Sequence, residues 1–431
     1  MQAPSPDRLE VLDDVVIEVD AGLIVSITDA SRADLDGTEL ELGDESVLLP
    51  GLVDAHIHAP QWPQLGTGLD LALEDWLFAH TFPLEARFVD QAFAQAVWSD
   101  MVSTLLGHGT TTAVYFGPRD RMATTLLAET CVAHGQRAFV GRTAMDHPDG
   151  TPEWYRDQSA AASVDASAAS VEEIRALGSP LVQPIVTPRF IPACTDAALA
   201  GLAEIATEMD VRVQTHCSES DWEHNHVLDR CGRSDTQALE AFGLLARSTV
   251  LAHGNFMSDA DLTTASGHGA GVAHCPLSNT YFANAVFPAR RAIDLGTHIG
   301  LGTDVAGGAS PGLLPQCAHA VSVSRHLDDG VDATLDGDIR GVVGSRIDIV
   351  EAFWMATLGG AELLDLPVGL LEPGRRFDAM AVRPGAIASG LRRWPDVDDD
   401  VRWFEKIVRL GSPTDIAHVW VDGVRVAGSD E

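Results

Sequence analysis

Eight apolar, strand-like runs, separated by longer Ala-rich helical stretches, constrain the fold of this chain more than any other feature. Strands that alternate with helices are typical of repeated β-α units around a parallel sheet. Eight such units over about 320 residues predict a (β/α)8 barrel with insertions. The predicted strands are Leu52–His58, Thr110–Phe116, Ala138–Met145, Leu181–Thr187, Val211–His216, Thr249–His253, Gly271–His274 and Ile299–Asp304.

Both ends of the chain have a different texture, in which short β-branched runs alternate with turns. Val15–Val19 and Leu23–Ile27 precede the barrel region, and Ala379–Val382 and Ala417–Val424 follow it. Sheets this short need a partner, so we expect the two ends to form one small discontinuous β-sandwich domain. The expected fold class is therefore α/β. We expect residues 1–48 and 375–431 to form the small domain, and residues 49–374 to form the barrel.

The charge balance excludes several classes of partner. The chain carries 28 Lys and Arg residues against 63 Asp and Glu residues, a net charge of −35. A surface this negative repels phosphate backbones and anionic lipid, so we expect no nucleic-acid partner and no membrane partner. The six cysteines are scattered without a C-x-x-C pair, and no signal peptide or long apolar span is evident, which favours a cytoplasmic location.

Two histidines at the end of the first predicted barrel strand begin a candidate metal site. His56 and His58 are two positions apart, and side chains at that spacing share one face of a strand. Both imidazoles can therefore converge on one ion. The similar pair His224 and His226 lies in a predicted helix, where the same spacing separates side chains by roughly 200°.

Three further candidate ligands lie at the ends of later predicted strands, where barrel enzymes assemble their sites. His216 and His253 end their strands, and Asp304 follows Gly302-Thr303 at the end of the last one. Imidazole nitrogens together with one carboxylate suit zinc, with ferrous iron or manganese as possible substitutes. Four histidines and one aspartate in this order predict a metal centre.

The scarcity of lysine favours one metal ion over two. Some barrel hydrolases bridge a metal pair with a modified lysine on the fourth strand, but Leu181–Thr187 contains no Lys, and Lys406 is the only lysine of the chain. A single divalent ion lowers the pKa of bound water from 15.7 to about 7. The expected reaction class is metal-assisted attack of water on an electrophilic carbon.

Glu219, three residues after His216, is the candidate proton carrier. Release of an amine from a tetrahedral adduct requires that the amine be protonated, which a nearby carboxyl group can do. The alternative is a glutamate that stabilises a helix N-terminus. Asp304 can bind metal and accept a proton from the water, and His253 can orient the nucleophile or stabilise developing charge.

The segment Pro50–His58, together with His216, His253 and Gly302-Thr303-Asp304, resembles the motifs of the amidohydrolase superfamily, in its purine and pyrimidine deaminase branch. The resemblance implies a catalytic barrel of the metal-dependent hydrolase type. The resemblance implies zinc bound by His56, His58, His216 and Asp304, with His253 close by. A cytidine-deaminase fold is excluded because its H-x-E and P-C-x-x-C signatures are absent. The segments that resemble the guanine deaminase family most closely are His56-Ile-His-Ala-Pro-Gln61, Thr81-Phe-Pro-Leu-Glu-Ala-Arg-Phe88, Val186-Thr-Pro-Arg-Phe190 and Gly302-Thr-Asp-Val-Ala-Gly-Gly308.

The same resemblance implies the substrate contacts and the reaction. Gln61 and Arg189 match residues that hydrogen-bond a purine base, and Phe190 packs at the pocket. The implied activity is hydrolytic deamination of guanine to xanthine and ammonia by a homodimer. The alternatives are a deaminase of an ammeline-type aminotriazine or of 8-oxoguanine, and a catalytically inactive scaffold. Trp62, Trp76 and Phe82 either close over the base as an aromatic lid or pack in the core.

Overall fold

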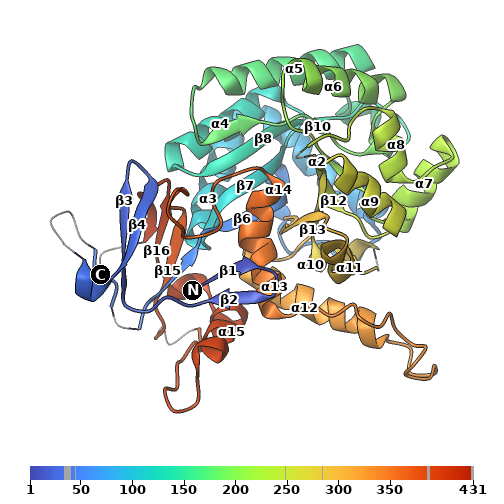
Figure 1. Cartoon of the computed structure of the whole chain (residues 1–431). Coiled ribbons are helices and arrows are strands. Elements are labelled where there is room, and N and C mark those ends of the chain that lie inside the picture. The colour runs from blue at the N-terminus through green and yellow to red at the C-terminus, as the bar shows by residue number, and fades with distance from the viewer. Residues whose placement is uncertain (34–39, 44, 248, 284, 386–388, 429–431) are drawn as a thin grey trace.

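The predicted apolar runs form a parallel β-barrel surrounded by helices in the computed structural model (Figure 1). The structure describes residues 1–33, 40–43, 45–247, 249–283, 285–385 and 389–428. The first four barrel strands pair in parallel in chain order, the fourth being divided in two pieces that both pair with the third, and the last four also pair in parallel in chain order. The barrel strands are β6 (Leu52–His58), β7 (Thr110–Gly117), β8 (Arg137–Ala144), β9 (Val182–Pro184), β10 (Thr187–Pro188), β11 (Gln214–Cys217), β12 (Val250–His253), β13 (Gly271–His274) and β14 (His298–Leu301).

Backbone hydrogen bonds close the barrel at two seams. At the first seam, the Gln214 N–H donates to the Val186 carbonyl over 2.9 Å, which joins β11 to the end of the fourth strand. At the second, the Asp304 N–H donates to the His56 carbonyl over 2.9 Å and the His58 N–H donates to the Val305 carbonyl over 3.0 Å. The second seam therefore fixes the segment that carries Asp304 directly beside the two histidines of β6. The barrel part of the fold prediction is confirmed.

The fourth strand differs from the expected continuous run Leu181–Thr187. It is divided into β9 and β10, which end at Pro184 and Pro188 respectively. Proline has no N–H to donate to the ladder, so two prolines four residues apart interrupt the pairing. Arg189 follows the second proline and therefore leaves the barrel at its carboxyl end.

The outer helices begin at side chains that accept the first free N–H groups, as in Asp90, Asp120, Thr195 and Ser258. In Figure 1, α12 runs out from the barrel body. Within the described ranges, none of the helices combines the length and the apolar character needed to cross a bilayer. The main helices are α3 (Gln91–Gly107), α4 (Arg121–His134), α5 (Ala160–Ala176), α6 (Asp196–Glu208), α7 (Asp221–Cys231), α8 (Asp235–Ala241), α9 (Asp259–Gly267), α11 (Ala289–Asp294), α12 (Leu313–Asp329), α13 (Ile349–Trp354) and α14 (Gly360–Leu363).

A smaller antiparallel sheet combines strands from both ends of the chain. Its order is β17 (Val424–Gly428), β16 (Ile416–Val421), β15 (Ala379–Val382) and β5 (Val47–Pro50), and the hairpin of β3 (Val15–Asp20) and β4 (Leu23–Asp29) lies beside it. Ile24, Phe377 and Trp420 share the small core between them. The two ends therefore meet as expected, while the domain bounds at residues 48/49 and 374/375 stay a prediction.

The C-terminal segment also contains a helix that the sequence analysis did not predict. Helix α15 (Asp400–Leu410) packs against α12 and α13. Its buried residues Trp403, Phe404, Ile407 and Val408 follow a helical spacing of three to four positions. The acidic run that precedes it includes Asp399, whose carboxylate accepts the Arg402 N–H and so caps the helix. The acidic run Asp396–Asp400 therefore includes the first residue of the helix and its N-cap.

A buried ion pair joins the barrel to the small sheet. The Arg137 guanidinium at the start of β8 donates twice to the Asp378 carboxylate just before β15, over 3.0 Å in each bond. Removing one partner leaves a buried charge unpaired, so we expect Arg137→Ala to lower the free energy of unfolding by about 3–5 kcal/mol. Urea denaturation measures this change. Arg409→Ala, which removes an exposed pair with Glu405, should cost about 0.5 kcal/mol or less, and equal losses in both variants would contradict the prediction.

Candidate active site

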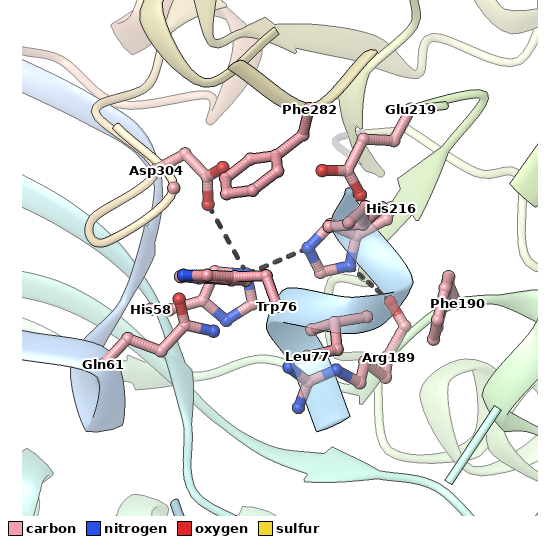
Figure 2. Close-up of a pocket in the computed structure, with 12 residues that line it drawn as sticks. His58, Gln61, Trp76, Leu77, Arg189, Phe190, His216, Glu219, Phe282 and Asp304 are labelled. Atoms are coloured by element: carbon pink, nitrogen blue, oxygen red, sulfur yellow. Dashed lines mark hydrogen bonds and ion pairs between the residues drawn. The ribbon is translucent and has the colours of Figure 1, made fainter. Parts of the chain in front are cut away.

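The five predicted metal-site residues meet at the carboxyl end of the barrel. His56 and His58 lie on the same face of β6, His216 is on β11, and Asp304 follows β14. The His56 Nε2 is 3.2 Å from the Asp304 Oδ1, and the His58 Nε2 is 2.9 Å from the His216 Nε2. His253 completes the cluster at the end of β12. Figure 2 shows three of these side chains, His58, His216 and Asp304, converging beside the pocket.

Hydrogen bonds fix which ring nitrogens face the centre. The His216 Nδ1 lies 2.5 Å from the Arg189 carbonyl oxygen, which only accepts, so Nδ1 carries the proton and Nε2 is bare. The His253 Nδ1 lies 2.9 Å from the Asn279 Oδ1, which leaves its Nε2 bare in the same way. Asn279 was not singled out by the sequence analysis. Such partners on the far ring nitrogen are typical of metal-ligating histidines.

Unpaired buried nitrogens support a cation at this point. Both ring nitrogens of His56 and the Nε2 of His253 are buried and lack a hydrogen-bond partner in the described part of the chain. A buried polar atom without a partner is costly, and a metal ion accepts the lone pairs that hydrogen bonds do not use. Neutral imidazoles and one carboxylate are also the donor types that zinc prefers. The residues present therefore fit a single divalent ion.

Burial sets the charge states that metal binding requires. Burial lowers the pKa of His56, His58 and His216 well below the usual value, so these imidazoles are neutral at neutral pH. Burial also raises the pKa of the Asp304 carboxyl. Neutral imidazole is the form that ligates metal, and the carboxylate is the one anionic ligand of the predicted set.

Glu219 lies at the edge of the cluster, where Glu219, His253 and Asp304 offer ligand atoms within 4.8 Å of one another. Its carboxylate Oε1 is 3.7 Å from the His253 Nε2, and its backbone is held by the Glu223 carboxylate, which accepts the Glu219 N–H over 2.7 Å. Burial, followed by repulsion from Asp304, raises the pKa of the Glu219 carboxyl well above its usual value. The N-cap of α7 is Ser220, so Glu219 precedes the helix and does not cap it. Its position therefore favours the proton carrier over the helix-stabilising alternative.

Three residues around the cluster adopt backbone conformations that residues other than glycine rarely adopt. The φ angles are 54° at Ser218, 77° at His253 and 46° at Asp304. Non-glycine residues in this left-handed region cost free energy and are found where the surrounding structure enforces them, often at functional sites. The strain lies just where the strand ends turn side chains toward the centre.

A cavity opens onto the cluster. Gln61, Arg189 and Phe190, the predicted substrate contacts, all line it. Apolar side chains form another part of its wall, where the Trp76 and Phe282 rings lie 4.8 Å apart between their centroids. The full lining comprises His58, Gln61, Leu73, Trp76, Leu77, Arg189, Phe190, His216, Glu219, Phe282, Asp304 and Gly307 (Figure 2).

The three aromatic residues considered for a lid divide among different positions. Trp76 lines the cavity. Phe82 is fully buried under the Arg189 guanidinium, whose central carbon lies 5.0 Å from the ring centroid. Trp62 donates its indole N–H to Asp100 and is not among the cavity residues. One of the three thus faces the substrate space, and the other two pack elsewhere.

The sequence analysis missed Glu85, which contacts both predicted base-reading side chains. Arg189 donates to its two carboxylate oxygens over 2.8 and 3.1 Å, and the Gln61 amide donates over 3.1 Å. The sequence offered one signal, an isolated glutamate within an otherwise mostly apolar stretch from Thr81 to Phe88. The helical pair His224 and His226 stays outside the cluster, because His224 is bonded to Asp235 on α8.

A parallel barrel with buried histidines and an aspartate at the carboxyl ends of its strands defines a metal-dependent hydrolase. The comparisons with known proteins specify the family. Residues 47–426 match the amidohydrolase family. The chain belongs to the amidohydrolase family, and within it to the group of guanine deaminases.

Three relatives carry that assignment. The guanine deaminase of Mus musculus is 36% identical over 97% of this chain and 93% of its own length. The probable guanine deaminase of Schizosaccharomyces pombe is 34% identical over 88% of this chain and 71% of its own. The crystal structure of guanine deaminase from C. acetobutylicum, with bound guanine in the active site, superposes with a TM-score of 0.84 at 26% identity, covering 98% of this chain and 97% of that one.

Proposed function

We propose that this chain is a guanine deaminase, which converts guanine and water to xanthine and ammonia in purine catabolism or salvage. The observation that carries the proposal is one cavity that joins two kinds of group. Arg189 and Gln61 offer hydrogen-bond donors, and Glu219 and Asp304 offer carboxyl groups beside the histidine cluster. Curated relatives with this activity over nearly the whole length support it.

The residues of the chain divide the chemistry of deamination among them. A divalent metal held by His56, His58, His216 and Asp304 would supply a water that is nucleophilic at neutral pH. Asp304 is placed to accept a proton from that water. Glu219, whose pKa is raised, holds a proton for a ring nitrogen of the base and then for the departing amine. His253 is placed to orient the nucleophile and to stabilise developing charge.

The base itself is bound by donors on one side and by apolar surfaces around it. Guanine presents a carbonyl oxygen and ring nitrogens as acceptors, which the Arg189 guanidinium and the Gln61 amide can both satisfy. The Phe190 ring packs at a tilt against Trp222, with the ring centroids 5.6 Å apart, and lies beside His216 in the wall of the cavity. Water adds at the carbon that bears the amino group, and that group leaves as ammonia.

Arg189→Ala should chiefly damage recognition of the base. Loss of hydrogen bonds from a charged donor costs about 1.5–3 kcal/mol each, so we expect kcat/KM for guanine to fall by roughly 10- to 100-fold, mostly through KM. Steady-state kinetics with guanine measures this change. Arg175→Ala, which removes an exposed guanidinium on α5 that does not line the cavity, is the control. Unchanged kinetics in Arg189→Ala would remove Arg189 from the site.

A panel of aminated bases tests the substrate. The kcat/KM for ammonia release should be highest with guanine and lower with 8-oxoguanine, ammeline, adenine and cytosine. A clear preference for ammeline or 8-oxoguanine would replace the substrate and keep the chemistry. Release from none of the bases by metal-loaded protein would favour the inactive scaffold.

We further propose that the ion is zinc rather than iron or manganese, that the chain forms a homodimer, and that it acts in the cytoplasm on a small-molecule base. Zinc follows from the donor set, and the dimer and the location follow from resemblance and composition. Metal analysis of the purified protein tests the first, and light scattering coupled to size-exclusion chromatography tests the second. A monomer at micromolar concentration would overturn the dimer.

A further inference from the structure

We propose that Glu85 is a positioning residue for base recognition, which holds the Arg189 guanidinium and the Gln61 amide so that both present N–H donors to the substrate. The inference rests on the proposed function and deepens it. Glu85 itself is not among the residues that line the cavity. It therefore acts through the two side chains that do.

The three side chains come from separate parts of the chain and meet out of contact with solvent. Glu85 is the last residue of α2 (Phe82–Glu85), Gln61 lies in the 3-10 segment Ala59–Gln64 after β6, and Arg189 follows β10. Each is at most 2% exposed. One carboxylate accepts three hydrogen bonds, two from Arg189 and one from Gln61. A shared buried acceptor couples the orientations of two residues that are 128 positions apart.

Glu85 determines which way the Gln61 amide points. The Gln61 Nε2 donates to Glu85, while the Gln61 Oε1 accepts the Ala306 N–H over 3.2 Å. A carboxylate only accepts and a backbone N–H only donates, so a flipped amide would place oxygen against oxygen and N–H against N–H. The amide therefore has one orientation. The amide keeps a second N–H as a donor, and Gln61 lines the cavity.

Glu85 also makes a buried arginine tolerable. Burial opposes the positive charge of Arg189, but the Glu85 carboxylate outweighs burial and keeps the pKa of Arg189 above its usual value. The bidentate pair fixes the guanidinium plane, which the Phe82 ring supports from one face. A neutral pair with a fixed plane offers directional donors to the base without an unpaired charge in the pocket.

The consequence is a preference for acceptors on the base. A carbonyl oxygen on the base accepts hydrogen bonds from Arg189 and Gln61. An amino group at the same ring position would instead place its own N–H donors against theirs. A site built for hydrogen bonding rejects such analogues strongly, because its buried polar groups are then unpaired. The Glu85 carboxylate thus contributes to the discrimination of guanine from 2,6-diaminopurine, which carries an amino group in place of the carbonyl.

The test compares Glu85→Gln with the native, metal-loaded chain. We expect kcat/KM for guanine to fall at least tenfold, mostly through an increase in KM. The ratio of kcat/KM for guanine to kcat/KM for 2,6-diaminopurine should decrease by a similar factor. Binding of xanthine, followed by calorimetry, should weaken in parallel. Glu85→Asp, which keeps the charge, should recover part of the loss. A fall in kcat alone, or no change in KM and in xanthine affinity, would overturn the proposal.

Two further variants separate positioning from stability. Asp378→Asn removes the carboxylate of another buried bidentate pair, with Arg137, and should lower the melting temperature without changing KM. Adding Glu85→Gln to a chain that already carries Arg189→Met and Gln61→Leu should change KM little, since Glu85 acts through these two side chains. Additive losses would overturn the proposal, and this pair of variants remains informative if Glu85→Gln alone folds poorly.

The native chain separates this inference from the proposed function. If the native protein prefers another base in the panel, guanine deamination is refuted as its function. The same comparison of KM and kcat with the preferred base then still decides whether Glu85 positions Arg189 and Gln61.

Discussion

Glu219→Gln lowers kcat for guanine deamination by about 10²- to 10⁴-fold, the usual share of general acid-base catalysis. The amide has the shape of the carboxyl group but cannot deliver a proton to a ring nitrogen and then to the leaving amine. The contacts that hold the residue are made by its backbone, from its N–H to Glu223 and from Asn255 to its carbonyl, so they survive the substitution. Position is therefore kept while the proton is lost.

Stopped assays of ammonia release measure the effect, and two readouts show that the site is otherwise intact. Metal content and affinity for xanthine should equal those of the native chain, because Glu219 belongs to neither the predicted ligands nor the base-reading pair. Glu204→Gln, an exposed glutamate on α6, is the matched control and should leave kcat unchanged. Near-native kcat in Glu219→Gln would refute the assignment of the proton carrier to this residue.

The metal cluster could be predicted because it follows from strand geometry. Alternation along a strand places His56 and His58 on one face, and parallel strands end at the same rim of a barrel. Once the strand ends were located to within a few residues, His216, His253 and Asp304 had to meet the pair on β6. No contact between distant side chains had to be known in advance.

Glu85 could not be predicted because its role depends on a contact across 104 residues. It lies in a continuous helical stretch formed by α1 (Leu73–Trp76), the π-helix Leu77–Thr81 and α2, and the π-helix interrupts the 3.6-residue period. Trp76, which lines the cavity, lies in this stretch, and Trp62, which does not line it, lies in the 3-10 segment before it. Sequence patterns report which face of a regular element is buried, and the change of period here obscures that face.

The hydrogen-bond partners of the histidine Nδ1 atoms could not be predicted, for a different reason. The Arg189 carbonyl that fixes the His216 tautomer is a backbone atom, and every residue has one. Arg189 follows Pro188 at the end of β10, and there its carbonyl meets the His216 ring. A sequence can indicate that two prolines interrupt a strand, but the direction in which the chain then turns depends on packing against its neighbours.

Removing the metal should abolish deamination. Without an ion to activate water, the barrier rises by several kcal/mol, so we expect a loss of at least about 10³-fold after complete chelation, reversed by added zinc. An ion at this centre would also stabilise the folded chain by binding lone pairs that have no hydrogen-bond partner among the described residues, so the melting temperature should fall as metal content falls. Undiminished activity in protein shown by metal analysis to be free of ion would contradict the assigned centre.

A pair of histidine variants locates the ion within the barrel. His216→Asn removes a bare Nε2 from the cluster, so bound metal and activity should be lost together. His274→Asn removes another buried imidazole, which lies at the end of β13 and packs against Phe287 outside the cluster. That variant should be less stable yet keep its metal, since the ion depends on which nitrogens converge and not on burial alone. Equal metal loss in both variants would place the ion elsewhere.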